Sequence, residues 1–113
     1  MITIYHNPRC SKSREGLELL EKSGKTFEVV KYLEDNLTKE DLETIIIKLG
    51  IQPIDLVRKN EAIWKSDYKG KNLSDKQVID AMITNPKLIE RPIVVNGSKA
   101  VIGRPKESIS KII

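Results

Sequence analysis

Apolar and polar positions in the first third of the chain follow first a strand pattern and then a helical one. Residues 2–5 are β-branched or aromatic and end at a His-Asn-Pro loop, which predicts a strand and a turn. From Ser11, leucines recur at helical spacing, and Gly24 predicts the end of that helix. A second strand is predicted over residues 26–32. Strand, helix and strand in this order predict a βαβ unit with parallel strands and a right-handed crossover.

The middle of the chain has helical patterns throughout. The predicted helices cover the segments 38–49, 53–57, 61–68 and 74–85. Thr38 and Ser74 are the predicted N-caps of the two longer ones. No linker or repeat separates this block from its flanks. We therefore expect a single domain over residues 1–113, with a helical insertion at about 37–86.

The last part of the chain returns to strand patterns. Residues 92–95 and 99–102 are predicted strands around an Asn-Gly-Ser turn, which indicates a hairpin, and 106–113 has the pattern of a short closing helix. The element order is therefore βαβ, helical block, ββα. A parallel pair of strands joined to an antiparallel hairpin gives a mixed four-stranded sheet. This is the thioredoxin-like plan of the α/β class.

Composition and charge narrow the function classes. The chain is 39% hydrophobic and 32% charged, which fits a soluble globular protein. No apolar run approaches the roughly 20 residues of a membrane helix, and the N-terminus lacks a signal-peptide layout. The net charge of +4 lies within residues 86–113, without a basic block or interleaved aromatics. We therefore expect a cytoplasmic protein and a monomer, with no membrane and no nucleic acid among its partners.

Cys10 is the only cysteine, so the chain has no internal disulfide and no cysteine-rich metal site. We expect no metal. The residue lies where the first strand meets the first helix, and the N–H groups of a first helical turn lack partners within the helix. Together with the helix dipole, they lower the pKa of a thiol placed there and can hold a tetrahedral oxyanion. The alternative is a small buried hydrophobic residue.

The residues beside Cys10 suit an anion site. Ser11 and Ser13 offer hydroxyl donors, and the loop is flanked by the basic residues Arg9 and Arg14. His6, the only histidine, has three possible roles. It favours the thiolate as a charged neighbour, orients the loop through hydrogen bonds, or faces water.

Three further arginines lie far from the loop in the sequence. Arg91 precedes Pro92, and in a thioredoxin-like plan this pair faces the start of the first helix, with a proline that is commonly cis. The alternative for Pro92 is simple strand initiation. Arg104 follows the last strand. Arg58 follows a short apolar turn and, taken alone, is typical of a solvated helix residue.

Taken together, four segments resemble the glutaredoxin-coupled arsenate reductase family. They are residues 6–14, 56–60, 89–95 and 102–105, and the resemblance extends over essentially the whole chain. It implies that Cys10 attacks arsenate and that His6 helps to lower the thiol pKa, with Pro92 in support. It also implies a set of substrate-binding residues, namely Arg58, Arg91, Arg104, Ser11, Lys12, Ser13 and Arg14. Glutathione is then the co-substrate and glutaredoxin the partner, and no cofactor is bound.

Two other functions stay open at this point. Spx-type transcription regulators share the fold and bind RNA polymerase, but many carry a CxxC switch where this chain has Ser13 in place of the second cysteine. A related thiol-dependent enzyme acting on another oxyanion is the second alternative. The single cysteine fits an enzyme that borrows its reductant, because the chain has no resolving cysteine.

Overall fold

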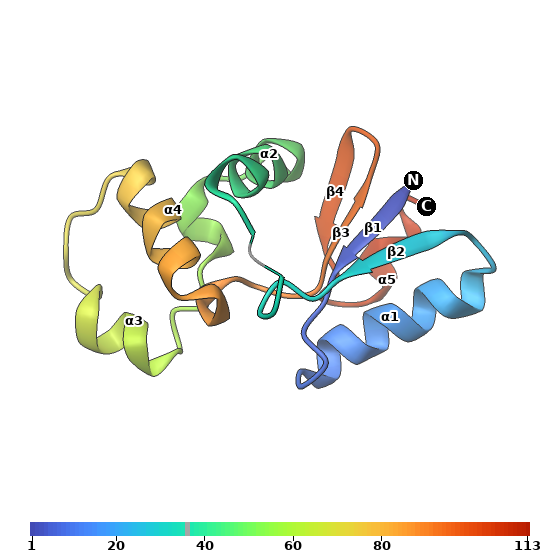
Figure 1. Ribbon diagram of the computed structural model, residues 1–113, viewed down its shortest axis with the longest axis horizontal. Coiled ribbons are helices and arrows are strands. Elements are labelled where there is room, and N and C mark those ends of the chain that lie inside the picture. Colours follow the sequence, from blue (N-terminus) through green and yellow to red (C-terminus); the bar gives the residue numbers. More distant parts are fainter. Residues whose placement is uncertain (36) are drawn as a thin grey trace. The chain divides into compact units, whose positions relative to one another are not determined.

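The computed structural model describes residues 1–35 and 37–113 and divides into two compact units (Figure 1). The first unit is made of the segments before Leu37 and from Arg91 to Ile113, and the second is Leu37–Glu90. The second unit begins at the predicted start of the insertion and ends a few residues beyond its predicted end, and the single domain stays a prediction. Among the described residues, no helix is both long enough and apolar enough to cross a membrane.

The first unit contains a mixed four-stranded sheet. Its strands are β1 (Ile2–Tyr5), β2 (Phe27–Val30), β3 (Ile93–Asn96) and β4 (Lys99–Ile102). Their order across the sheet is β2-β1-β3-β4. β1 runs parallel to β2 and antiparallel to β3, and β3 and β4 form the hairpin. The predicted thioredoxin-like sheet is confirmed, although β2 is shorter than expected.

Two helices cover one face of this sheet, α1 (Ser11–Ser23) and α5 (Glu107–Ser110). α1 ends where predicted, because Gly24 adopts the left-handed conformation with φ of 73°. The core beneath the helices consists of Ile2, Ile4, Leu20, Val94 and Ile109. Alternate residues of β1 point into this core, as the period of two in a strand requires.

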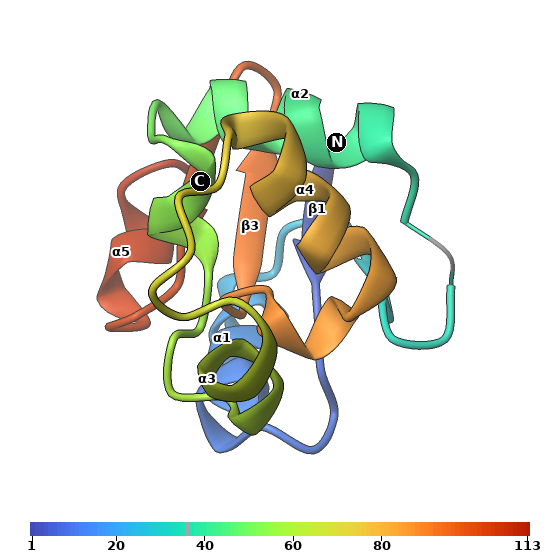
Figure 2. The ribbon, with the colours of Figure 1, turned by 90° about the vertical axis from the view of Figure 1, so that its left-hand side faces the viewer.

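The second unit is helical (Figure 2). Its elements are α2 (Lys39–Leu49), η1 (Pro53–Leu56), α3 (Ala62–Asp67), α4 (Asp75–Thr84) and η2 (Pro86–Leu88). Both predicted N-caps are confirmed: Thr38 forms a capping box with Asp41, and Ser74 forms one with Gln77. α4 packs against α2, η1 and η2. The sequence did not indicate η2, a single 3₁₀ turn.

Strand register brings three loops together at one edge of the sheet. Tyr5, the last residue of β1, pairs with Ile93, the first residue of β3. Ile93 also pairs with Ile102, the last residue of β4. The segments 6–10, 91–92 and 103–105 therefore leave the sheet beside one another, although they are far apart in the sequence.

Candidate active site

The loop after β1 is held by its own hydrogen bonds. The Asn7 side-chain oxygen accepts the Arg9 N–H at 3.0 Å, and the Asn7 carbonyl accepts the Cys10 N–H at 3.0 Å. The Arg14 guanidinium donates to the Pro8 carbonyl at 2.9 Å. Asn side chains commonly fix turns in this way. The loop thereby delivers Cys10 to the N-cap position of α1. Arg14 was expected to bind substrate. In the structure its guanidinium donates to the Pro8 carbonyl of the loop, and its binding of substrate stays a prediction.

A buried network lies behind the loop. The Ser13 hydroxyl oxygen accepts the Asn7 N–H at 3.0 Å and lies 2.6 Å from His6 Nδ1. Ser13 is fully buried. Its hydroxyl is thus engaged within the protein, and the expectation that it donates to an anion does not fit this geometry. The Ser13 backbone N–H is the group that faces the thiol.

His6 is also buried, and burial is the main reason that its pKa lies below the ordinary value. The positive charges of Lys31 and Arg14 lower this pKa further, while a hydrogen bond with the Ser13 backbone opposes the shift. The lowered pKa favours the neutral imidazole. Of the roles expected for His6, the geometry fits the orienting one, because the buried ring lies 2.6 Å from the Ser13 hydroxyl.

The environment of Cys10 favours its charged form. Partial burial raises the thiol pKa, but the Ser13 N–H, the Arg91 side chain and the Lys12 N–H all stabilise the thiolate. The positive charge of Arg91 adds to this, and the net effect is a pKa below the ordinary value. The groups that lower this pKa are N–H groups of the first helical turn and an arginine, as expected for an activated cysteine.

Two of the three predicted arginines meet the thiol. Arg91 is buried beside it, and Arg104 Nη2 lies 4.0 Å from Cys10 Sγ. Arg58 belongs to the second unit, where its Nε lies 3.3 Å from a Glu90 carboxylate oxygen. Its part in the site stays a prediction.

Of the other loop residues, Ser11 and Lys12 are exposed at the start of α1. Lys12 Nζ lies 3.5 Å from a Glu15 carboxylate oxygen.

Pro92 is held between two glycines that the sequence did not single out for the site. A Cβ atom at Gly16 would lie 2.8 Å from Pro92 Cγ, and one at Gly103 would lie 2.9 Å from the same atom. The Pro92 carbonyl also accepts the Gly103 N–H at 2.7 Å. The Arg91–Pro92 peptide is cis, as expected, and so is Arg104–Pro105. The two glycines allow Pro92, and with it Arg91, to approach α1 closely.

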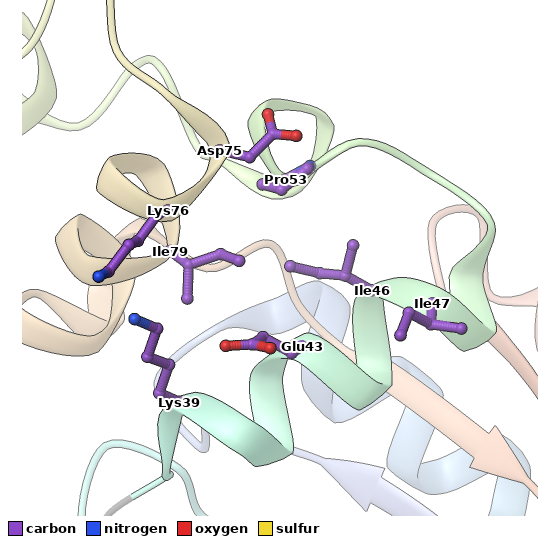
Figure 3. A pocket seen from close by; sticks show the side chains of 8 residues that line it. All are labelled: Lys39, Glu43, Ile46, Ile47, Pro53, Asp75, Lys76 and Ile79. Atoms are coloured by element: carbon purple, nitrogen blue, oxygen red, sulfur yellow. The ribbon is translucent and has the colours of Figure 1, made fainter.

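The second unit contains a cavity of about 500 Å³ between α2, η1 and α4 (Figure 3). Ile46 and Ile79 point into it from opposite sides, and the lysine side chains Lys39 and Lys76 lie at one end. None of its eight lining residues is a cysteine or a histidine. Within the described part of the chain, no three His, Cys, Asp or Glu side chains are grouped to hold a metal ion.

Comparison with known proteins identifies the family of the chain. The ArsC family model matches residues 5–112. The Escherichia coli protein YfgD is 46% identical, over 99% of this chain and 96% of its own length. An arsenate reductase of Haemophilus influenzae is 41% identical over 99% and 98%. The solved structure of an arsenate reductase from Vibrio cholerae has a TM-score of 0.94 at 44% identity and covers 99% of this chain and 97% of that one. With its thiolate-favouring Cys10 loop on a thioredoxin-like sheet, this chain belongs to the ArsC family.

Proposed function

We propose that this protein reduces arsenate to arsenite, with Cys10 as nucleophile and with glutathione and glutaredoxin as electron donors. The observation that carries the proposal is the thiol at the start of α1, whose pKa is lowered by helix N–H groups and by Arg91. Family membership supports the substrate, because relatives at about 40% identity over nearly the whole chain bear the name arsenate reductase.

The charges near the thiol suit a tetrahedral dianion. A thiolate and arsenate repel each other, and at 4 Å each pair of unit charges costs about 4 kcal/mol at an effective dielectric constant of 20. The guanidinium groups of Arg91 and Arg104 offset this repulsion at the sulfur. Planar guanidinium groups can also donate two parallel hydrogen bonds to an oxyanion, which places its central atom. Arg58 is proposed as the third such group.

The proposed reaction begins with attack of the Cys10 thiolate on As(V). A sulfur–arsenic bond forms and one arsenic–oxygen bond breaks, with the oxygen leaving as water. The glutathione thiol displaces a second oxygen in the same manner. The glutaredoxin thiolate then attacks the glutathione sulfur, and the electron pair of the broken arsenic–sulfur bond stays on arsenic as As(III). Hydrolysis of the bond to Cys10 releases arsenite and restores the thiolate.

The test is arsenate-dependent oxidation of NADPH, coupled through glutathione reductase, glutathione and glutaredoxin. The wild-type protein should turn over and Cys10→Ser should be silent. Arg91→Lys and Arg104→Lys should each lose roughly tenfold or more, because charge without the planar fork does not replace bidentate binding. Lys111→Ala removes an exposed cation of the same unit and serves as the matched control.

An active coupling system with no arsenate-dependent turnover would refute the proposal. Turnover with a different oxyanion would then indicate the related thiol enzyme, and capture of RNA polymerase by the purified protein would indicate the regulator.

A further inference from the structure

The first unit contains a cavity of its own, and one of its lining residues, Arg104, also approaches the nucleophile. Its volume is about 370 Å³, within the range of roughly 300–1,000 Å³ that small-ligand sites occupy. It is lined by Lys12, Glu15, Arg104, Pro105, Lys106 and Glu107, and we refer to it as the Arg104 cavity. Arg104 is shared with the nucleophile, since its Nη2 lies 4.0 Å from Cys10 Sγ. Arg104 therefore connects this cavity with the reacting sulfur.

The walls of the Arg104 cavity carry charges of both signs. Three cations and two carboxylates line it, which gives a net charge of +1. Lys12 and Glu15 form an ion pair at 3.5 Å on the α1 side. The opposite wall presents Arg104, Lys106 and Glu107 from the segment after β4. A wall with two cations and one carboxylate matches a ligand with two carboxylates and one ammonium.

We propose that the Arg104 cavity binds the low-molecular-weight thiol that completes the reaction, a thiol with two carboxylates and one ammonium, of which glutathione is the example. This inference rests on the proposed function. In glutathione the thiol lies on the central residue, between a γ-glutamyl arm and a glycyl carboxylate. Binding of both ends to the charged wall leaves the thiol free to turn toward Cys10. An uncharged thiol gains nothing from this wall.

The chemical step that this placement serves is the second one of the proposed reaction. The bound thiol adds to arsenic in the Cys10 adduct, a sulfur–arsenic bond forms, and an oxygen leaves as water after taking up the thiol proton. Arsenic stays As(V) until the glutaredoxin thiolate attacks the bound sulfur. The cavity supplies proximity: a thiol held next to the adduct reacts without a separate encounter.

Lys106→Glu tests the assignment, because Lys106 lines the cavity but is not one of the residues proposed to bind arsenate. Lys111→Glu is the matched control, with the same charge change at an exposed position outside the cavity. Binding is measured by calorimetry with S-methylglutathione, whose blocked sulfur cannot react. Turnover is measured with varied glutathione and, separately, with varied arsenate. Circular dichroism checks that both variants fold.

We expect Lys106→Glu to raise the Kd for S-methylglutathione and the KM for glutathione by roughly three- to tenfold. The KM for arsenate should change by less than about twofold, and Lys111→Glu should match the wild type, as expected when an exposed charge lies away from the ligand. Equal Kd values in wild type and Lys106→Glu would overturn the assignment, and so would equal weakening by the two variants. Binding that follows this pattern without arsenate turnover would refute the proposed function and support the cavity assignment. Arsenate turnover with an unchanged KM for glutathione in Lys106→Glu would support the proposed function and refute the cavity assignment.

Discussion

For Gly16→Ala, helix propensity predicts a gain in the free energy of unfolding, and packing predicts a loss. Gly16 lies in the middle of α1, where replacing glycine by alanine ordinarily stabilises a helix by about 0.5–1 kcal/mol. The added Cβ, however, would lie 2.8 Å from Pro92 Cγ and 3.1 Å from Ile109 Cδ1. Ordinary carbon–carbon contacts are about 3.5–4.0 Å. Pro92 and Ile109 are both fully buried, so neither side chain has free space to move into.

The overlap with Pro92 is about 0.7 Å relative to a 3.5 Å contact. Overpacking of this kind costs about 1–3 kcal/mol, and subtracting the propensity gain of about 0.5–1 kcal/mol leaves a net loss of about 1 kcal/mol at the middle of the two ranges. Gly103→Ala meets the same two side chains at 2.9 Å and 3.0 Å but lies outside any helix. Without the propensity gain, its loss should be larger, about 1–3 kcal/mol.

Urea unfolding followed by circular dichroism measures both losses. With an m-value of about 2 kcal/mol/M, a loss of 1–2 kcal/mol lowers the midpoint by about 0.5–1 M. Glu21→Ala, on the exposed side of the same helix, should shift it little. A displaced Pro92 should also move Arg91 and raise the pKa of the Cys10 thiol. A midpoint for Gly16→Ala at or above the wild-type value, with an unchanged thiol pKa, would refute the argument from packing.

Three further changes test the network and the caps. Arg91→Lys should raise the pKa of the Cys10 thiol, since a stabilising partner of the thiolate is lost. The pH at which iodoacetamide alkylation reaches half its maximal rate should therefore rise, and an unchanged value would contradict this. Ser13→Ala should cost about 1–3 kcal/mol in urea unfolding because its buried hydroxyl bonds two groups, whereas the exposed Ser11→Ala should cost little. Thr38→Ala removes the N-cap of α2 and should cost about 1 kcal/mol, measured in the same way; an unchanged midpoint would show that the cap adds nothing.

Local signals explain why most element boundaries could be predicted. Gly24 and Gly50 end helices in the left-handed conformation, and Thr38 and Ser74 begin them through capping boxes. Each of these features depends on residues within one turn, so the sequence alone carries it. The isolated bridge between Val57 and Ile89 depends on segments distant in the sequence, and no local pattern indicates it.

The site divides in the same way. The place of Cys10 at a strand–helix junction followed from neighbouring residues, and so did its lowered pKa. The hydrogen bonding of the Ser13 hydroxyl inside the protein could not be predicted in this way. Its partners, His6 and Asn7, lie on the other side of the loop, and its burial depends on the folded core. The fit of Pro92 between Gly16 and Gly103 joins three distant segments. The sequence did not predict this fit. A glycine that leaves room for a neighbouring side chain and a glycine that only weakens its helix look the same in the sequence.

The gain in reactivity from a lower Cys10 pKa is limited, because a more stabilised thiolate is a weaker nucleophile. Each unit by which the pKa falls toward ambient pH raises the thiolate fraction at most about tenfold, while nucleophilicity falls about threefold. Below ambient pH the fraction no longer grows, and further stabilisation only slows attack. Cations bound to the oxyanion carry no such penalty, because they stabilise charge that develops on the oxygens in the transition state. The buried Arg91 lowers the pKa of the Cys10 thiol, while the exposed Arg104 lies 4.0 Å from the sulfur. In the proposed reaction, Arg91 and the helix N–H groups stabilise the thiolate, and the exposed Arg104 is the guanidinium that contacts first the oxyanion and then the thiol that follows it.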